Sequence, residues 1–200
     1  MNYTQHYQLP QWVDSDRIMM DDFNDMTQKI DSGLSNIDTQ LANLPIVKLA
    51  EETLTAAANS LDLDLSAVDL TQYSELRFLI RGGVSTVDTA LHLRLNNNAA
   101  ESYDAGAAGS SSNVTSTSWS LYSRFNTNAV CQGTLLPIGT TGRAGAYWYA
   151  AGLINNYIAP VFCGGLHRTM LFTNISKLHF FPEEGNLIQG TTAAVYGMRK

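Results

Sequence analysis

The chain has 200 residues, of which 44% are hydrophobic and only 15% are charged, and its formal net charge is −6. This length allows one sizeable domain with an appendage, or two small domains. The low charged fraction leaves a polar surface built mainly from Ser, Thr, Asn, Gln and Gly. The negative charge excludes a broad basic surface for nucleic acid or anionic lipid, so we expect neither partner.

Features of the termini and the cysteines indicate where the protein is made. Residues 1–12 lack the basic start and unbroken apolar core of a signal peptide, and no apolar run approaches the roughly 20 residues of a membrane span. We therefore expect synthesis in the cytoplasm without export. Cys131 and Cys163 fit no zinc spacing, which favours two free thiols over the alternative of a single disulfide.

The first zone, residues 1–17, has bulky side chains among small polar ones. Pro10 disfavours a helix at Leu9, which predicts an extended arm. Tyr7, Leu9 and Trp12 cannot cover one another within such an arm. The arm is therefore expected to lie against another surface.

The second zone, residues 18–44, is predicted to be one long amphipathic helix that ends at Pro45. Its apolar positions recur with a mean spacing of about 3.5 residues, the period of a supercoiled helix. We call these positions the helical ridge: Phe23, Met26, Ile30, Leu34, Ile37, Leu41 and Leu44. The ridge can pack on sister chains or on the rest of its own chain. The candidate N-caps are Asp14, Ser15 and Asp16.

The third zone, residues 46–200, changes to a period of two. Leu61, Leu63 and Leu65 alternate with Asp62 and Asp64, as in a strand with one buried face. Strands are expected at 47–56, 60–66, 75–83, 89–96, 115–125, 129–139, 145–154, 169–175, 176–181 and 191–200. Turns are expected between them, including residues 162–168 and the long stretch 96–113. This pattern predicts an antiparallel β-sandwich, most simply a jelly roll. The expected domains are residues 1–45, an arm and an oligomerisation helix, and residues 46–200, the sandwich.

Catalytic motifs are missing from the sequence, and neither a cofactor nor a metal is expected. The histidines His6, His92, His167 and His179 are far apart and complete no metal site. Asp62 and Asp64 would lie on one strand face about 7 Å apart, a spacing that resembles a glycosidase pair. Neighbouring carboxylates on a solvated strand face are the more ordinary interpretation, so we expect no enzyme.

Aromatic residues provide the candidate ligand contacts. In AYWYA, residues 146–150, Tyr147 and Tyr149 share one strand face and Trp148 takes the other. Such rings fit either a subunit interface or a sugar site, in which apolar sugar faces stack on aromatic rings. Tyr103 and Asp104 are the large side chains of the stretch 96–113 and complete the set of candidate ligand-binding residues.

The opening YQLPQWVDSDRIMMDDFNDMTQKID resembles the start of many bacteriophage and prophage structural proteins. Those proteins begin with a Y-x-L-P-x-W arm, followed by D-R, D-F-N and a K-I-D helix. The matching positions here are Tyr7, Leu9, Pro10, Trp12, Asp16, Arg17, Asp22, Phe23, Asn24, Lys29, Ile30 and Asp31.

The downstream segments DLTQYSELRFLI, LHLRLNNN with SYD, and EEGNLIQGTTAAVYGMRK resemble the β-sandwich of tail-fibre or receptor-binding proteins from phages of Gram-positive hosts. The resemblance implies a virion protein that docks to the tail or baseplate through residues 1–20. It also implies a homotrimer formed by the helix and a β-domain that contacts host cell-wall polysaccharide. The first alternative is a phage structural or decoration module without receptor function. The second, less favoured alternative is a polysaccharide-degrading enzyme.

Overall fold

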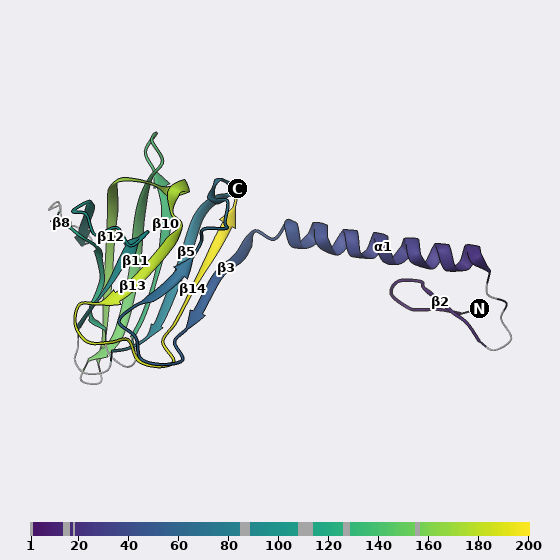
Figure 1. Ribbon diagram of the computed structural model, residues 1–200, viewed down its shortest axis with the longest axis horizontal. Helices are drawn as coiled ribbons and strands as arrows, with labels where there is room; N and C mark the ends of the chain where they lie inside the picture. The colour runs from purple at the N-terminus through teal and green to yellow at the C-terminus, as the bar shows by residue number, and fades with distance from the viewer. Residues whose placement is uncertain are drawn as a thin grey trace. The chain divides into compact units, whose positions relative to one another are not determined.

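The computed structural model describes residues 2–13, 17, 19–84, 89–107, 114–125, 129–154 and 157–200. The chain divides into two compact units, Met1–Leu44 and Pro45–Lys200 (Figure 1). We refer to them as unit 1 and unit 2 and describe each by itself.

Unit 1 contains one long helix, α1 (Met20–Ala42), which is slightly shorter than the predicted range 18–44. The three candidate N-caps at positions 14–16 lie outside the described residues. Instead, the Asp22 carboxylate accepts a hydrogen bond from the Met19 backbone N–H at 3.3 Å, at the start of the helix. Asp21 and Asp22 place negative charge in the first turn, where the helix dipole favours it.

The helical ridge is largely uncovered within unit 1. Phe23, Leu34 and Leu41 expose 52%, 58% and 57% of their surface, and Ile30 and Ile37 are also exposed. A polar helix depends on burial of its apolar stripe for most of its stability. The described unit therefore leaves the stabilising surface of α1 available to another molecule.

The arm was predicted to be extended, and in the structure it folds back on itself as a hairpin. Strands β1 (Asn2–Tyr3) and β2 (Pro10–Gln11) pair in antiparallel fashion, and Gln8 turns the chain with φ at 52°. The hairpin meets its own helix, because Lys29 Nζ donates to the Gln8 carbonyl at 3.3 Å. A hollow of about 240 Å³ between arm and helix is lined by Tyr7, Leu9, Lys29, Ile30, Gly33, Leu34 and Ile37.

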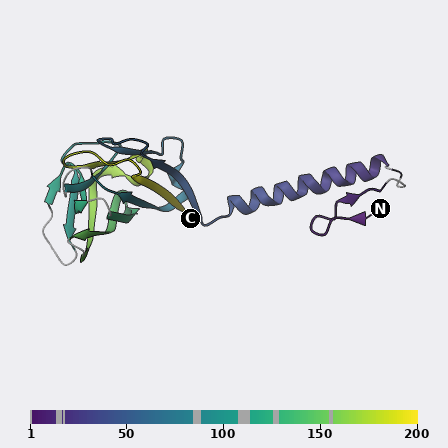
Figure 2. The same ribbon diagram turned by 90° about the horizontal axis from the view of Figure 1, so that it is seen from below.

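Unit 2 is an antiparallel β-sandwich, which confirms the predicted class (Figures 1 and 2). Its strands are β3 (Ile46–Thr53), β4 (Leu61–Asp64), β5 (Tyr73–Gly82), β6 (Thr89–Leu95), β7 (Tyr103–Ala107), β8 (Val114–Ser116), β9 (Trp119–Phe125), β10 (Ala129–Ile138), β11 (Arg143–Ile154), β12 (Tyr157–Leu171), β13 (Lys177–Pro182) and β14 (Thr192–Arg199). Two 3-10 turns, η1 (Leu70–Gln72) and η2 (Phe172–Asn174), lie between strands.

The strands form two layers among the described residues. The larger sheet has eight strands in the order β3-β14-β5-β10-β11-β12-β7-β8, and the smaller has four in the order β4-β13-β6-β9. The leucines expected to face inward on β4 and β6 are buried between the sheets, as is Phe78 on β5. Period-two alternation therefore identified the inner faces correctly, because successive side chains of a strand point to opposite sides.

Two stretches predicted as turns are strands. The stretch 96–113 contains β7, and residues 162–168 continue β12 through Gly164 and Gly165. At Gly165 a Cβ would lie 2.4 Å from Trp119 Nε1 and 2.6 Å from the Asp104 carbonyl oxygen. Glycine is therefore required here by close packing and not by a turn. The predicted strand at 169–175 is wrong beyond Leu171, where η2 begins.

The turn after β6 is held by its own asparagines. Asn96 and Asn97 both have φ near 54°, and the Asn98 N–H donates to the Leu95 carbonyl at 3.0 Å. The Asn96 side chain accepts from the Ser176 N–H at 2.7 Å and donates to the Asn174 carbonyl at 2.8 Å. These bonds tie the turn to the segment that precedes β13.

Candidate functional site

Aromatic side chains gather on the outer face of the eight-stranded sheet, away from the core. The register pairs Thr134 with Tyr147 and Gln132 with Tyr149 across β10 and β11, and Tyr149 with Phe162 across β11 and β12. Two parallel rows of outward side chains therefore cross the sheet, two residues apart along each strand. Residues distant in sequence become neighbours in this way.

These rows enclose a hollow of about 530 Å³, which we call the aromatic hollow. A hollow of this size is large enough for a ligand of drug or disaccharide dimensions. Its lining residues come from β5, β10, β11, β12 and β14: Arg77, Phe78, Leu79, Gln132, Gly133, Thr134, Tyr147, Tyr149, Phe162 and Tyr196.

The hollow offers apolar ring faces beside hydrogen-bonding groups. Tyr147, Tyr149 and Phe162 expose 45%, 41% and 54% of their surface. Gln132 adds an amide that both donates and accepts, and Thr134 adds a hydroxyl. Large exposed rings beside a few polar groups are suited to an amphipathic ligand such as a sugar, or to a protein partner.

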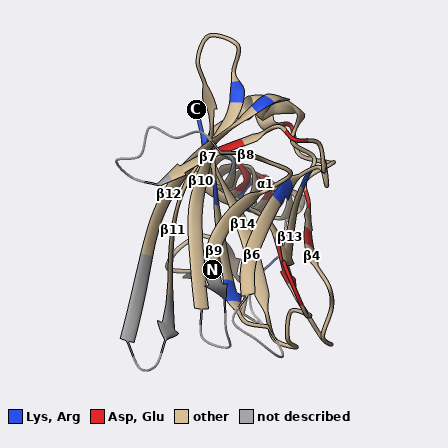
Figure 3. Cartoon of the chain, turned by 90° about the vertical axis from the view of Figure 1, so that its left-hand side faces the viewer, with Lys and Arg blue, Asp and Glu red and all other residues tan. Residues whose placement is uncertain are grey.

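Among the strands behind the hollow, β10, β11 and β12 carry little charge (Figure 3), whereas β5 brings Arg77 and Glu75. Strand β10 contains no Lys, Arg, Asp or Glu, and the charged residues of β11 and β12 are Arg143 and Arg168, which lie near one end of the hairpin. Recognition on this face therefore depends mainly on ring contacts and neutral hydrogen bonds.

The three predicted ligand residues of AYWYA lie on opposite faces of β11, as the alternation of side chains along a strand requires. Tyr147 and Tyr149 line the aromatic hollow, whereas Trp148 is 1% exposed and its ring centroid lies 6.0 Å from that of Trp119. The inclusion of Trp148 among the ligand contacts is corrected, because its side chain belongs to the core between the sheets.

Tyr103 is likewise a core residue and not a ligand contact, since it is fully buried. Its ring meets Trp119 edge-on, with centroids 5.3 Å apart. Its hydroxyl accepts a hydrogen bond from the Leu95 N–H at 2.9 Å and donates to the Asn98 carbonyl at 3.0 Å. Tyr103 therefore anchors the turn after β6 to β7.

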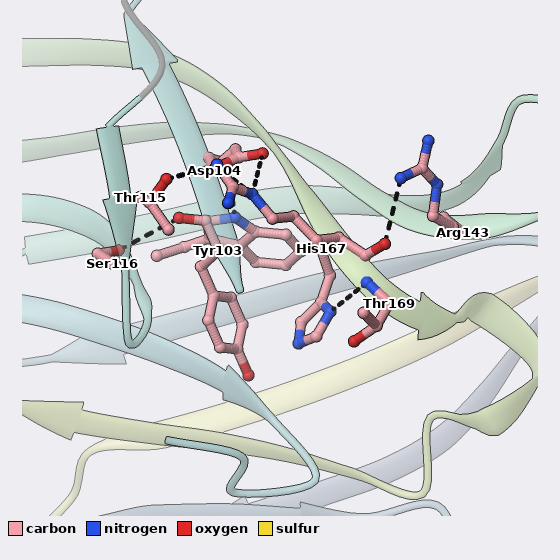
Figure 4. Close-up of polar contacts among 9 residues, drawn as sticks. Tyr103, Asp104, Thr115, Ser116, Arg143, His167 and Thr169 are labelled. Carbon is pink, nitrogen blue, oxygen red and sulfur yellow. Dashed lines mark hydrogen bonds and ion pairs between the residues drawn. The ribbon is translucent and has the colours of Figure 1, made fainter. Parts of the chain in front are cut away.

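Asp104, the neighbour of Tyr103, ties three strands together (Figure 4). Arg168 Nε on β12 lies 3.0 Å from both carboxylate oxygens, and the Thr115 hydroxyl on β8 donates to Oδ1 at 3.1 Å. The hydrogen bond from Arg168 is the main cause that lowers the pKa of Asp104. Because both oxygens are engaged, we assign Asp104 to the sheet edge and not to ligand binding.

His167 is the buried titratable residue of this network (Figure 4). Its Nδ1 accepts from the Met170 N–H at 2.9 Å and from the Thr169 N–H at 3.3 Å, so the ring proton sits on Nε2. The Tyr103 ring packs edge-on against it at 4.5 Å. Burial lowers the pKa of His167 below its ordinary value of 6.5.

We expect acid to destabilise unit 2 through His167 before the carboxylates titrate. In the unfolded chain the His167 ring takes up a proton near pH 6.5, whereas in the folded chain it does so only at lower pH. The contribution of neutral His167 to the free energy of unfolding is therefore complete above pH 6.5 and is lost as the pH falls below that value. Denaturant unfolding between pH 7.5 and 5 measures this slope. His167→Asn keeps an acceptor near the position of Nδ1 and is expected to reduce the pH dependence of the free energy of unfolding. Part of that dependence is expected to remain, because burial also lowers the pKa of His92. An unchanged slope in the variant would contradict the assignment.

Several residues of the hollow were not identified from the sequence. Arg77, Gln132, Thr134, Phe162 and Tyr196 come from four strands, and only the pairing register brings them to the two tyrosines. The aromatic residues themselves were the feature of the sequence that could have indicated this site. Phe162 was missed because it lies in a stretch that was predicted to be a turn.

The acidic pair is placed on the outer face of the four-stranded sheet. Asp62 Oδ1 lies 2.5 Å from His179 Nδ1, and Asp62 Oδ2 lies 3.2 Å from Lys177 Nζ. Asp64 accepts from the Ser66 N–H at 2.9 Å, and this bond is the main cause that lowers its pKa. Each carboxylate thus has structural partners of its own.

In the part of the chain that the structure describes, no group of three or more His, Cys, Asp or Glu is arranged to hold a metal ion. Cys131 and Cys163 are free thiols there, and burial raises the pKa of both. No described helix is both long and apolar enough to cross a membrane.

Fold and site together define a two-layer antiparallel β-sandwich with an exposed aromatic hollow on its larger sheet. No protein-family model matches the chain, and no curated protein sequence matches it. Similar solved structures include the galectin LEC-6 of Caenorhabditis elegans, with 13% identity, a TM-score of 0.36 and coverage of 73% of this chain and 95% of the galectin.

Two further structures are similar at the same low level. The SPBc2 prophage-derived protein YomS has 9% identity, a TM-score of 0.28 and coverage of 76% of this chain and 89% of its own. The binding domain of botulinum neurotoxin serotype D has 7% identity, a TM-score of 0.33 and coverage of 78% and 43%.

Proposed function

We propose that the chain is a structural adhesion protein of a bacteriophage or prophage particle that binds a host-surface glycan. The observation that carries glycan binding is the aromatic hollow, where Tyr147 and Tyr149 present exposed rings beside Gln132 and Thr134. The phage setting rests on the resemblance of the arm and helix motifs. In this proposal the protein acts by adhesion and carries out no catalysis.

Association is the second part of the proposal. The exposed helical ridge of α1 packs against the same ridge in sister chains, because its mean spacing near 3.5 residues suits a supercoiled bundle. The preferred number of three rests on the resemblance to phage structural proteins. The arm, residues 1–20, docks to a tail or baseplate protein. Tyr3, Tyr7 and Val13 support this role, since each exposes more than half of its surface. The assembled virion is the proposed location.

The double variant Tyr147→Ala/Tyr149→Ala tests the glycan site. Wild-type protein is expected to bind oligosaccharides from the host wall in calorimetry, and loss of both rings is expected to weaken binding at least about tenfold, or ~1.4 kcal/mol. Val130→Ala is the matched control, because Val130 is exposed on β10 and does not line the hollow. Thermal unfolding confirms that each variant is folded.

A second function is favoured by the low charge of the same face. A sheet surface of rings with few charges also suits a protein interface, so a phage structural or decoration module without receptor function would bury it against another virion protein. The same calorimetry and the same tyrosine variant distinguish the two proposed functions. If no host-wall oligosaccharide binds at millimolar concentration while the tyrosine variants disturb assembly, the structural module replaces the adhesin.

A further inference from the structure

We infer that the aromatic hollow selects glycans that carry an oxyanion, either a carboxylate or a phosphate, and that Arg77 recognises this group. The inference rests on the proposed glycan binding and names the class of glycan. It is carried by the position of one guanidinium among otherwise neutral lining residues.

Among the residues that the structure describes, Arg77 is the only charged one that lines the hollow. It lies on β5 and is paired in register with Thr134 on β10 and with Tyr196 on β14. Its side chain is 51% exposed, so the guanidinium meets both solvent and the hollow. A ligand resting on Tyr147 would therefore lie two strands away from this cation, across Thr134.

The Nε edge of the Arg77 guanidinium is engaged by Glu75, and the edge formed by the two Nη nitrogens is available to a ligand. Glu75 Oε1 accepts from Arg77 Nε at 2.7 Å, which fixes the orientation of the group. Among the described residues no hydrogen-bond partner is found for the two Nη nitrogens of Arg77. Two parallel N–H groups match the geometry of a carboxylate or phosphate, which they bind through paired hydrogen bonds.

The charge balance requires that the sugar and the anion are recognised together. Glu75 offsets the charge of Arg77, and the whole chain is at −6, so a free anion gains little from the protein's field. A sugar ring stacked on the tyrosines would hold its substituent near Arg77, where a charge-assisted hydrogen bond adds to the ring contacts. Free phosphate is therefore expected not to bind at millimolar concentration.

The experiment compares three forms of one oligosaccharide by calorimetry with the full chain: neutral, uronic-acid-containing and phosphorylated. At least one charged form is expected to bind about tenfold more tightly than the neutral form. Arg77→Gln is expected to remove this preference, so that binding of the charged form falls about tenfold more than binding of the neutral form. Glu75→Gln keeps a partner for Nε but removes the opposing charge, so it is expected to strengthen binding of the charged form.

The matched control is Arg81→Gln. Arg81 lies on the same strand, points to the same face and has the same charge, but does not line the hollow. Equal binding of neutral and charged forms, an equal loss of both in Arg77→Gln, or tight binding of free phosphate would each overturn the inference while glycan binding stands. Failure of every form to bind would instead overturn the proposed function itself.

Discussion

If the chain forms the proposed homotrimer, replacing Ile30 and Leu34 with Gln is expected to convert it to a monomer at micromolar concentration. Both side chains are exposed in unit 1 and lie one turn apart on the helical ridge. Each buried Ile or Leu contributes about 1.5–3 kcal/mol, and a trimer would lose six of them at once. Light scattering measures the mass, and circular dichroism is expected to show loss of helix, because an unpartnered polar helix is marginal.

The control for this change lies on the opposite face of the same helix. Ser32→Gln with Thr39→Gln adds the same side chains about half a turn away from the ridge and is expected to leave the trimer intact. A wild-type monomer at micromolar concentration would refute self-association, and a trimeric Ile30→Gln/Leu34→Gln protein would refute the ridge as its cause.

Gly165→Ala is expected to lower the free energy of unfolding of the sandwich by about 3 kcal/mol. The added methyl would lie 2.4 Å from Trp119 Nε1 and 2.6 Å from the Asp104 carbonyl oxygen, and these two atoms are hydrogen-bonded at 3.1 Å. The substitution therefore forces two packed strands apart and breaks a partly buried hydrogen bond. Thermal unfolding is expected to shift downward by about 6–12 °C.

The adjacent residue provides a matched control. A methyl group at Gly164 would meet only the Ala146 carbonyl oxygen at 3.4 Å, so Gly164→Ala is expected to be tolerated within about 0.5 kcal/mol. Similar losses in both variants would show that the strand itself requires glycine for its backbone, and that packing against Trp119 is not the cause.

Local alternation was enough to predict the inner faces of the sandwich. Leu91, Leu93 and Leu95 are buried, and Asp62 and Asp64 face outward, as their period of two required. The same reasoning failed for β7 and for residues 162–168 of β12, which are rich in small residues. Their strand conformation is fixed by partners distant in sequence, above all Trp119 over Gly165.

The candidate site was predicted only in part for the same reason. Alternation placed Tyr147 and Tyr149 on one face, but it could not show which face is covered by the second sheet. Tyr103 and Asp104 are the large residues of a stretch predicted to be a loop, but in the structure Tyr103 lies in the core and Asp104 forms an ion pair with Arg168.

Composition and residue spacing were sufficient to predict the chemical character of each zone: a polar helix with an apolar ridge, alternating strands and a chain poor in charge. The packed sandwich was needed to bring Arg77, Gln132, Tyr147, Phe162 and Tyr196 to one hollow. Side-chain periodicity is a local property that each strand carries alone. Strand order and register depend on contacts between segments far apart in the chain, and these contacts exist only once the two sheets have packed.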